Sequence, residues 1–183
     1  MVPRPLGRTG IKVSPIGLGT TKLGRNTDVK YPKPFELPSD EQAGELLEAA
    51  FALGVNLIDT APAYGGSETK LGPFVAQHRN RLVLCTKCGE KYEQGRSTYD
   101  FSASAVVASA EESLRRLRTE CLDILLVHSD ARDAEILTQT DALEGLARLK
   151  KSGKVRAIGI SARTAAGIAE AARTLDVIMA PFS

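Results

Sequence analysis

The sequence predicts an α/β fold of the (β/α)8 TIM-barrel type that is incomplete, with about six parallel strands alternating with helices after an N-terminal hairpin. Short apolar runs recur along the 183 residues, and a helix-like segment follows most of them. Strands joined in this way pair in parallel through right-handed crossovers. Ionisable residues end several strands, which favours a barrel, because a doubly wound open sheet gathers its ligand groups near one switch point.

Six runs carry the strand signal, since each is apolar and is bounded by Gly, Pro, Asp or Ser. The expected strands cover residues 16–19, 56–59, 82–87, 122–128, 155–161 and 177–180. A hairpin with its turn near residues 8–10 precedes them. A complete (β/α)8 barrel typically takes about 250 residues. We therefore expect residues 1–183 to form a single domain that lacks the last two βα units.

Capping residues mark the helices that separate these strands. Ser39 and Gln42 form a capping-box pattern, Gly54 would end the same helix, and Ser102 would cap a later one. The expected helices cover residues 40–53, 68–77, 103–117, 141–151 and 164–175. Three longer segments show no apolar periodicity, and we expect loops there. They are residues 21–38, 88–101 and 129–139.

The composition excludes several classes of function. The chain is 43% hydrophobic and 25% charged, as in an ordinary soluble globular protein. Its 24 basic and 22 acidic residues are spread along the sequence, so we expect no nucleic-acid partner. No run approaches the roughly 18 apolar residues of a membrane helix, and the N-terminus lacks the apolar core of a signal peptide. Three cysteines form no disulfide framework, and we expect a cytoplasmic location.

Ionisable side chains end three of the expected strands, at Asp59, Lys87 and His128. Side chains alternate along a strand, so these three converge at one rim if their faces point inward, and Tyr64 can fold back over them from the following loop. A phenol normally ionises near about pH 10, and a nearby ammonium favours the phenolate. The set therefore suits proton donation to a carbonyl oxygen that gains charge during reduction. Taken singly, each residue has a structural interpretation as a solvated rim, packing or lid residue.

Two further motifs are rejected as sites. Cys85 and Cys88 form C-x-x-C, but residues three apart in a strand point to opposite faces, which disfavours a shared metal or disulfide. Gly17 and Gly19 could suggest a dinucleotide fingerprint, but the next glycine is too far away at Gly24. We therefore expect no metal site and no Rossmann-type cofactor loop.

The segment from Asp59 to Glu68, DTAPAYGGSE, resembles the signature of the aldo-keto reductase family. Lys87 and His128 fall where that family has its catalytic lysine and histidine, and residues 6–20 and 153–161 are similar to it as well. The resemblance is collinear over nearly the whole chain.

This resemblance implies the reduction of an aldehyde or ketone to an alcohol, with NADPH (NADP) as cofactor and a small carbonyl compound as substrate. It implies that Tyr64 is the general acid, that Lys87 lowers its pKa, that His128 orients the carbonyl, and that Asp59 holds Lys87. The residues it implies for cofactor binding are Gly19, Thr20, Thr21, Asp59 and Ser161.

Two departures from the family pattern leave an alternative open. Ala162 stands where the family usually has an asparagine, which removes one amide contact. The family's recognition of the phosphate and adenine lies mainly after strands seven and eight, outside this sequence. The alternative is a non-catalytic binding or regulatory protein, or a truncated remnant, on the same scaffold. Open sheet edges would also favour association into a homo-oligomer.

Overall fold

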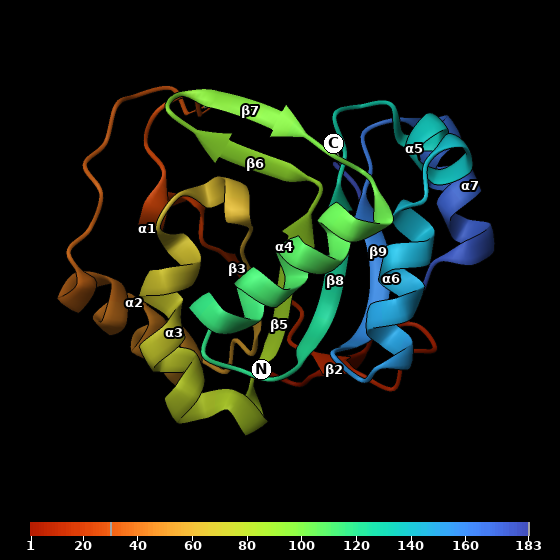
Figure 1. Ribbon diagram of the computed structural model, residues 1–183. Coiled ribbons are helices and arrows are strands. Elements are labelled where there is room, and N and C mark those ends of the chain that lie inside the picture. The colour runs from red at the N-terminus through yellow and green to blue at the C-terminus, as the bar shows by residue number, and fades with distance from the viewer. Residues whose placement is uncertain (30, 183) are drawn as a thin grey trace.

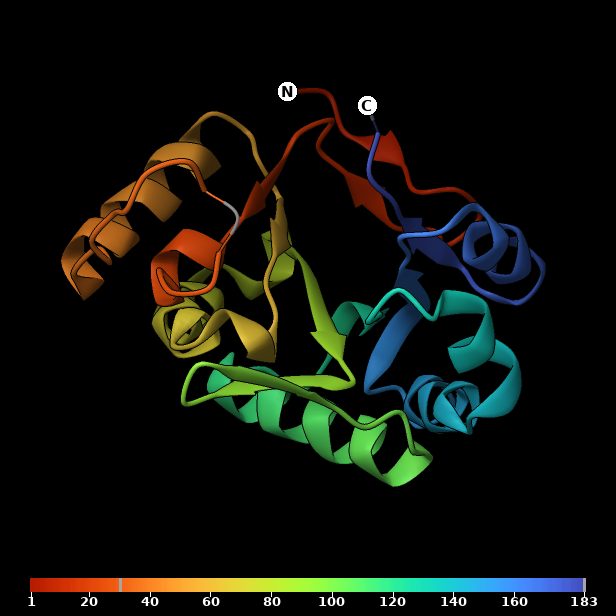
Figure 2. The same cartoon turned by 90° about the horizontal axis from the view of Figure 1, so that it is seen from above.

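The computed structural model describes residues 1–29 and 31–182, in which six parallel strands form a curled half-barrel (Figures 1 and 2). The six strands lie across the sheet in the order in which they occur in the sequence. The strands are β3 (Gly17–Gly19), β4 (Leu57–Asp59), β5 (Val83–Cys88), β8 (Leu122–His128), β9 (Val155–Ser161) and β10 (Val177–Met179). All five pairings are parallel, which confirms the predicted architecture.

Helices cover the outer face of this arc, as the view from above shows (Figure 2). They are α2 (Asp40–Ala52), α3 (Ser67–His78), α4 (Ala103–Arg116), α5 (Asp133–Gln139), α6 (Ala142–Lys151) and α7 (Ala165–Thr174). The predicted caps are confirmed for two of them. Ser39 and Gln42 form the capping box of α2, and the Ser102 hydroxyl accepts a hydrogen bond from Ala105 N–H at the start of α4. These contacts fix where each helix leaves its preceding loop.

Alternate residues of each strand face opposite sides of the sheet. Cys85 and Leu126 belong to the inner apolar cluster of the arc, whereas Leu84 and Leu125 pack outward against the helices. Cys85 and Cys88 accordingly lie in different clusters. This alternation decides which strand-end side chains point into the barrel, so it positions the site.

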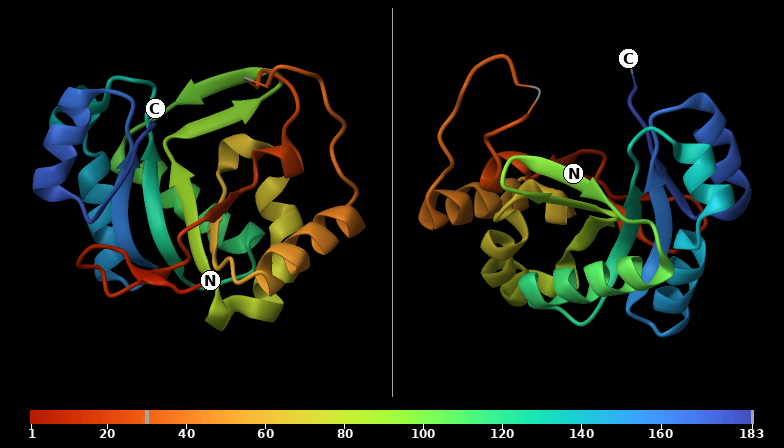
Figure 3. Two further views of the ribbon diagram at one scale, coloured as in Figure 1. Left: turned by 180° about the vertical axis from the view of Figure 1, so that it is seen from behind. Right: turned by 45° about the horizontal axis from the view of Figure 1, so that its top comes forward.

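The N-terminal hairpin closes the bottom of the half-barrel. It consists of β1 (Arg4–Pro5) and β2 (Lys12–Val13), and it lies at the end of the sheet opposite the β6–β7 hairpin described below (Figure 3). Ile11 at its turn is 1% exposed and joins the inner apolar cluster. Full burial of an isoleucine side chain contributes about 1.5–3 kcal/mol to stability. This side chain therefore holds the hairpin against the amino ends of the strands, which the hairpin covers.

Three segments predicted as loops contain regular structure. Residues 21–38 begin with α1 (Thr21–Gly24), residues 88–101 form a hairpin of β6 (Glu90–Glu93) and β7 (Arg96–Tyr99), and residues 129–139 contain α5. The hairpin strands are mostly exposed, so they need no apolar alternation. α1 and α5 are too short for a clear helical period. The loop predictions were wrong for these parts of the segments.

The hairpin has a turn that its sequence does encode. Gln94 and Gly95 connect β6 to β7, and both have positive φ angles, 50° and 79°. Two consecutive positive φ angles are typical of the type I′ turn, whose twist matches that of antiparallel strands. The hairpin therefore lies as a stable roof over the carboxyl ends of the barrel strands (Figure 1).

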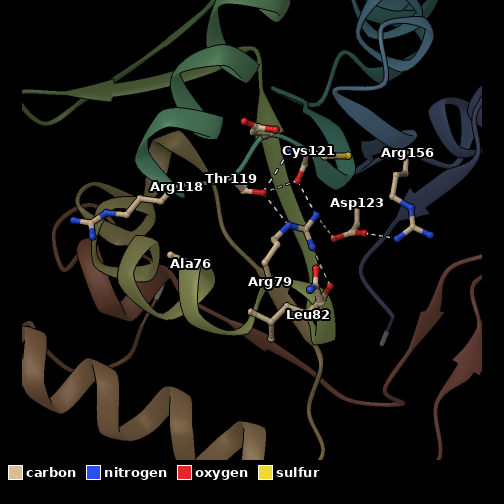
Figure 4. Close-up of a pocket in the computed structure, with 10 residues that line it drawn as sticks. Ala76, Arg79, Leu82, Arg118, Thr119, Cys121, Asp123 and Arg156 are labelled. Carbon is tan, nitrogen blue, oxygen red and sulfur yellow. Dashed lines mark hydrogen bonds and ion pairs between the residues drawn. The ribbon is translucent and has the colours of Figure 1, made fainter.

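A cavity of about 610 Å³ lies at the amino ends of the strands, away from this roof (Figure 4). Asp123, which is 1% exposed, is one of the residues that line it. Asp123 pairs with Arg79 at 2.9 Å and Arg156 at 2.6 Å, and it accepts a hydrogen bond from Leu84 N–H. Arg79 also donates to the Thr119 hydroxyl and to two backbone carbonyls. Asp123 and its partners satisfy one another's hydrogen bonds. We therefore interpret this group of residues as a structural clamp that joins β5 to β8.

Replacing Asp123 by alanine is expected to destabilise the protein by about 3 kcal/mol, because Arg79 would be left partly buried without its partner. Urea denaturation followed by circular dichroism measures this change. Glu120 lines the same cavity but is exposed, so Glu120→Ala serves as the control and should change stability by less than about 0.5 kcal/mol. Equal effects of the two substitutions would contradict the clamp.

The edges and surface of the fold add two observations. Within the described residues, β3 and β10 each pair with one neighbouring strand only, so they form the two edges of the arc. No helix in the described part of the chain is long and apolar enough to cross a membrane.

Candidate active site

The carboxyl ends of β4 and β5 bring Asp59 and Lys87 together, as predicted. The Lys87 ammonium lies 2.7 Å from Asp59 Oδ1 and donates to the Thr60 carbonyl at 2.9 Å. Lys87 is 1% exposed. Burial alone would lower the pKa of its ammonium, but the Asp59 carboxylate and the nearby Tyr64 hold that pKa above its usual value. The lysine therefore stays charged inside the barrel.

Tyr64 and His128 lie over this ion pair. Tyr64 ends a short 3-10 turn, η1 (Pro62–Tyr64), and its ring centroid is 4.7 Å from the Lys87 ammonium. The rings of Tyr64 and His128 meet edge to face, with centroids 6.0 Å apart. The structure thus brings all four predicted residues together at one rim, with a charged lysine against the phenol ring.

Close backbone packing holds the loop that carries Tyr64. A Cβ atom added to Gly24 would lie 2.3 Å from the Tyr64 carbonyl oxygen, and one added to Gly65 would lie 2.2 Å from the Gly24 carbonyl oxygen. Gly65 also has a positive φ of 61°. Arg25 donates a hydrogen bond to the Ala63 carbonyl at 3.1 Å. These two glycines therefore allow α1 to pack directly against the Tyr64 loop.

The residues predicted to bind a cofactor surround the same rim. A Cβ atom added to Gly19 would meet nothing within 4 Å, so the space at the end of β3 is open. Thr20 is 1% exposed, and its hydroxyl donates to the Asp59 carbonyl and accepts from Ser67. Thr21 is half-buried and begins α1. Ser161 ends β9 in register with His128. The Thr20 side chain thus holds the backbone of Asp59 by a hydrogen bond, whereas Gly19 and Ser161 border the open rim.

A buried carboxylate that the sequence reasoning missed lies beside His128. Glu90 Oε2 is 2.6 Å from His128 Nδ1, and Glu90 Oε1 accepts a hydrogen bond from the Ser97 hydroxyl at 2.5 Å. Glu90 is 6% exposed. Burial alone would raise its pKa, but His128, Ser97 and Tyr99 together lower that pKa to about 2. The sequence signal that could have indicated this hairpin is the turn at Gln94-Gly95, which follows the strand that carries Glu90.

The lowered pKa of Glu90 predicts a pH dependence of stability. Its pKa is about 2 in the fold against an ordinary value of 4.5, so the ionised form stabilises the fold above pH 4.5. This contribution is lost as the pH falls from 4.5 towards 2. We expect the free energy of unfolding of Glu90→Gln to fall less steeply in this window than that of the wild type. Glu93→Gln removes an exposed carboxylate from the same strand and should keep the wild-type slope. Parallel profiles for Glu90→Gln and the wild type would contradict the assignment.

Comparison with known proteins identifies the family. The family model described as "Aldo/keto reductase family" matches residues 15–180. The chain belongs to the aldo/keto reductase family. It is 37% identical over 163 residues to L-galactose dehydrogenase of Arabidopsis thaliana, with 86% of this chain and 47% of the relative covered. It is 31% identical over 194 residues to the NADH-specific methylglyoxal reductase of Escherichia coli (strain K12), with 98% and 58% covered.

Solved structures of the aldo/keto reductase family have the same fold. A crystal structure of an aldo-keto reductase from Pseudomonas aeruginosa superposes with a TM-score of 0.90 at 46% identity, covering 98% of this chain and 68% of that one. A holo form from Bacillus halodurans gives a TM-score of 0.84 at 28% identity, covering 100% and 58%. The chain spans about half the length of the curated relatives it matches. The half-barrel is thus the part of the family fold that this chain contains.

Proposed function

We propose that this site reduces an aldehyde or ketone to an alcohol with a nicotinamide cofactor. The observation that carries the proposal is the buried Lys87–Asp59 pair beneath the Tyr64 ring, with His128 at its edge. The lysine ammonium beside the ring can stabilise the negative charge that develops on the phenol oxygen as the tyrosine gives its proton to the carbonyl oxygen.

Each residue has a distinct part in this reaction. Tyr64 donates its hydroxyl proton to the carbonyl oxygen and recovers a proton from solvent afterwards. Lys87 stabilises the resulting phenolate, and Asp59 keeps the ammonium charged and in place. His128 hydrogen-bonds the reacting oxygen and orients the carbonyl group. The reduced nicotinamide, when bound, supplies the hydride to the carbonyl carbon.

Two features of the rim support a nicotinamide site. Gly19 leaves open space at the end of β3, and Ser161 offers a hydroxyl beside His128. We propose Gly19, Thr21 and Ser161 as cofactor contacts, with Thr20 and Asp59 supporting them. The family resemblance favours NADPH, whereas the printed name of the Escherichia coli relative specifies NADH. Both cofactors therefore belong in the test.

The names of several relatives specify small polar substrates, two of them sugars that are oxidised and one a dicarbonyl that is reduced. These relatives include L-galactose dehydrogenase, D-threo-aldose 1-dehydrogenase and a methylglyoxal reductase. Substrate would enter between the β6–β7 roof and the rim that carries Tyr64. We propose that the site takes an aldose or a short dicarbonyl in preference to a large apolar ketone.

The cytoplasmic location and the homo-oligomer through β3 and β10 stay predictions.

The function is tested by the oxidation of NADPH and NADH by the purified protein, with methylglyoxal, an aldose and an apolar ketone as substrates. We expect cofactor oxidation that depends on the aldehyde, together with saturable cofactor binding in a fluorescence titration. No binding at millimolar concentrations of either cofactor would overturn the proposal and favour a non-catalytic role for the scaffold.

A further inference from the structure

Glu90 is a buried ionisable group at the rim that the proposed reaction does not use. It begins β6, directly after Gly89, and its two carboxylate oxygens contact different partners. Oε2 lies 2.6 Å from His128 Nδ1, and Oε1 accepts from the Ser97 hydroxyl of the facing strand β7. A carboxylate held on both oxygens, rather than one that points to solvent, requires a structural or functional explanation.

The backbone around Glu90 fixes where its carboxylate lies. Gly89 has a positive φ of 92°, and a Cβ atom there would lie 2.7 Å from the Phe101 ring. Phe101 thus holds the hairpin closely at its base. Farther along β6, the Tyr92 ring lies 3.4 Å from the Arg25 guanidinium carbon, and its hydroxyl lies 3.1 Å from that of Thr27. The roof is held on both sides, so Glu90 meets His128 in one orientation.

We propose that Glu90 is a positioning residue that fixes the tautomer of His128 with the hydrogen on Nδ1. An ionised carboxylate only accepts hydrogen bonds, so its position 2.6 Å from Nδ1 favours the tautomer with the hydrogen on that nitrogen. Nε2 then remains as the ring nitrogen available to the substrate oxygen. It accepts a hydrogen bond when the ring is neutral and donates one when the ring is charged. The functional part of this inference rests on the proposed carbonyl reduction.

The contact between Glu90 and His128 is close, but it is not a well-aligned hydrogen bond. Glu90 Oε2 lies 2.6 Å from Nδ1, yet the pair does not have hydrogen-bond geometry, and Nδ1 has no other hydrogen-bond partner among the residues that the structure describes. Catalytic hydrogen bonds are often poorly aligned in ligand-free structures and tighten in the substrate complex. In the described part of the chain no other side chain satisfies this buried nitrogen, so Glu90 is the group to which we assign its tautomer.

A structural role in holding the hairpin makes a different prediction. If Glu90 served only to tie β6 to β7, its bond from Ser97 would matter and the ring of His128 would be unaffected. Ser97→Ala removes that bond while it leaves the pair with His128 in place. We therefore expect Ser97→Ala to preserve the tautomer of His128, and Glu90→Gln to change it.

Nitrogen-15 NMR of the imidazole ring reads this tautomer directly. The chain has two histidines, and His78 lies on the far side of the fold from the rim, paired with Glu48. His78→Gln therefore leaves His128 as the single imidazole signal of the chain. At a pH where this ring is neutral, we expect the Nδ1–H tautomer to predominate. Adding Glu90→Gln should shift the signals towards Nε2–H, whereas Glu93→Gln, on the exposed side of the hairpin, should not.

Kinetics provide the second readout. Loss of a carboxylate that orients a metal-ligating histidine typically costs about 10- to 100-fold in metal affinity or activity, and we take the same factor for this histidine. We expect Glu90→Gln to lower kcat by this factor with little change in cofactor affinity, and Ser97→Ala to retain most of the activity.

The outcomes separate this inference from the proposed function. A predominant Nε2–H tautomer in the parent, or an unchanged tautomer in Glu90→Gln, would overturn the positioning role. If the tautomer changes as expected but no variant or parent reduces any carbonyl, the proposed function fails and the effect of Glu90 on the ring stands. An unchanged kcat in Glu90→Gln, in an active enzyme, would overturn the catalytic importance of the pair.

Discussion

Tyr64→Phe is expected to lower kcat for carbonyl reduction by about 10²- to 10⁴-fold, the usual contribution of a general acid. Phenylalanine keeps the ring that meets Lys87 and His128, so packing at the rim should be preserved. Only the proton donor is removed. Steady-state kinetics with the best aldehyde of the panel measure the loss, and cofactor titration should give an unchanged Kd.

Tyr92→Phe is the matched control for this substitution. Tyr92 lies in the β6–β7 roof above the site, and its hydroxyl contacts Thr27 instead of the Lys87 site. The control should retain kcat within a factor of about two to three, because an exposed hydrogen bond contributes little. A Tyr64→Phe enzyme that keeps wild-type turnover would show that another group supplies the proton.

Lys87→Met is expected to lower kcat by about 10²- to 10³-fold, as for the loss of one preorganised electrostatic donor. It should also lower the free energy of unfolding, because Asp59 would lose the ammonium that neutralises it. Asp59 keeps some exposure, with a side chain that is 20% accessible, so we expect a loss of about 2 kcal/mol, below the range for a fully buried pair. Kinetics and urea denaturation measure the two effects separately.

A double variant separates catalysis from stability at this pair. Asp59→Asn combined with Lys87→Met removes both charges, so no isolated carboxylate remains. We expect it to recover most of the stability lost in Lys87→Met without recovering activity. If activity returned together with stability, the lysine would act only through folding, and its effect on Tyr64 would be refuted.

Much of the fold followed from local patterns in the sequence. The strand Val155–Ser161 was predicted at its observed bounds, and the capping box of Ser39 and Gln42 forms as expected. Parallel pairing followed from the helices between strands, since a parallel connection needs a long crossover. The convergence of Asp59, Lys87 and His128 followed from strand alternation, because side chains of like parity in neighbouring parallel strands share a face.

The β6–β7 hairpin was not predicted, and with it Glu90 was missed. Its strands carry Glu, Lys, Arg, Ser and Thr and lie mostly exposed, so no apolar alternation marks them. Only the turn at Gln94-Gly95 has a local signature. The ion pair with His128 joins residues 38 positions apart (128 − 90), and it exists because the hairpin folds back over the barrel mouth.

The sequence by itself determined the order of strands and helices, the shared face of the strand-end residues and the identity of four candidate catalytic groups. These properties depend on the period of the side chains along each element, which is a local quantity. The tertiary structure alone decided the partner of His128, the support of Asp59 by Thr20, and the close approach of Gly24 to the Tyr64 loop. Such contacts join segments that are distant along the chain. They depend on how the β6–β7 roof and the curled sheet pack in three dimensions, which no local sequence pattern specifies.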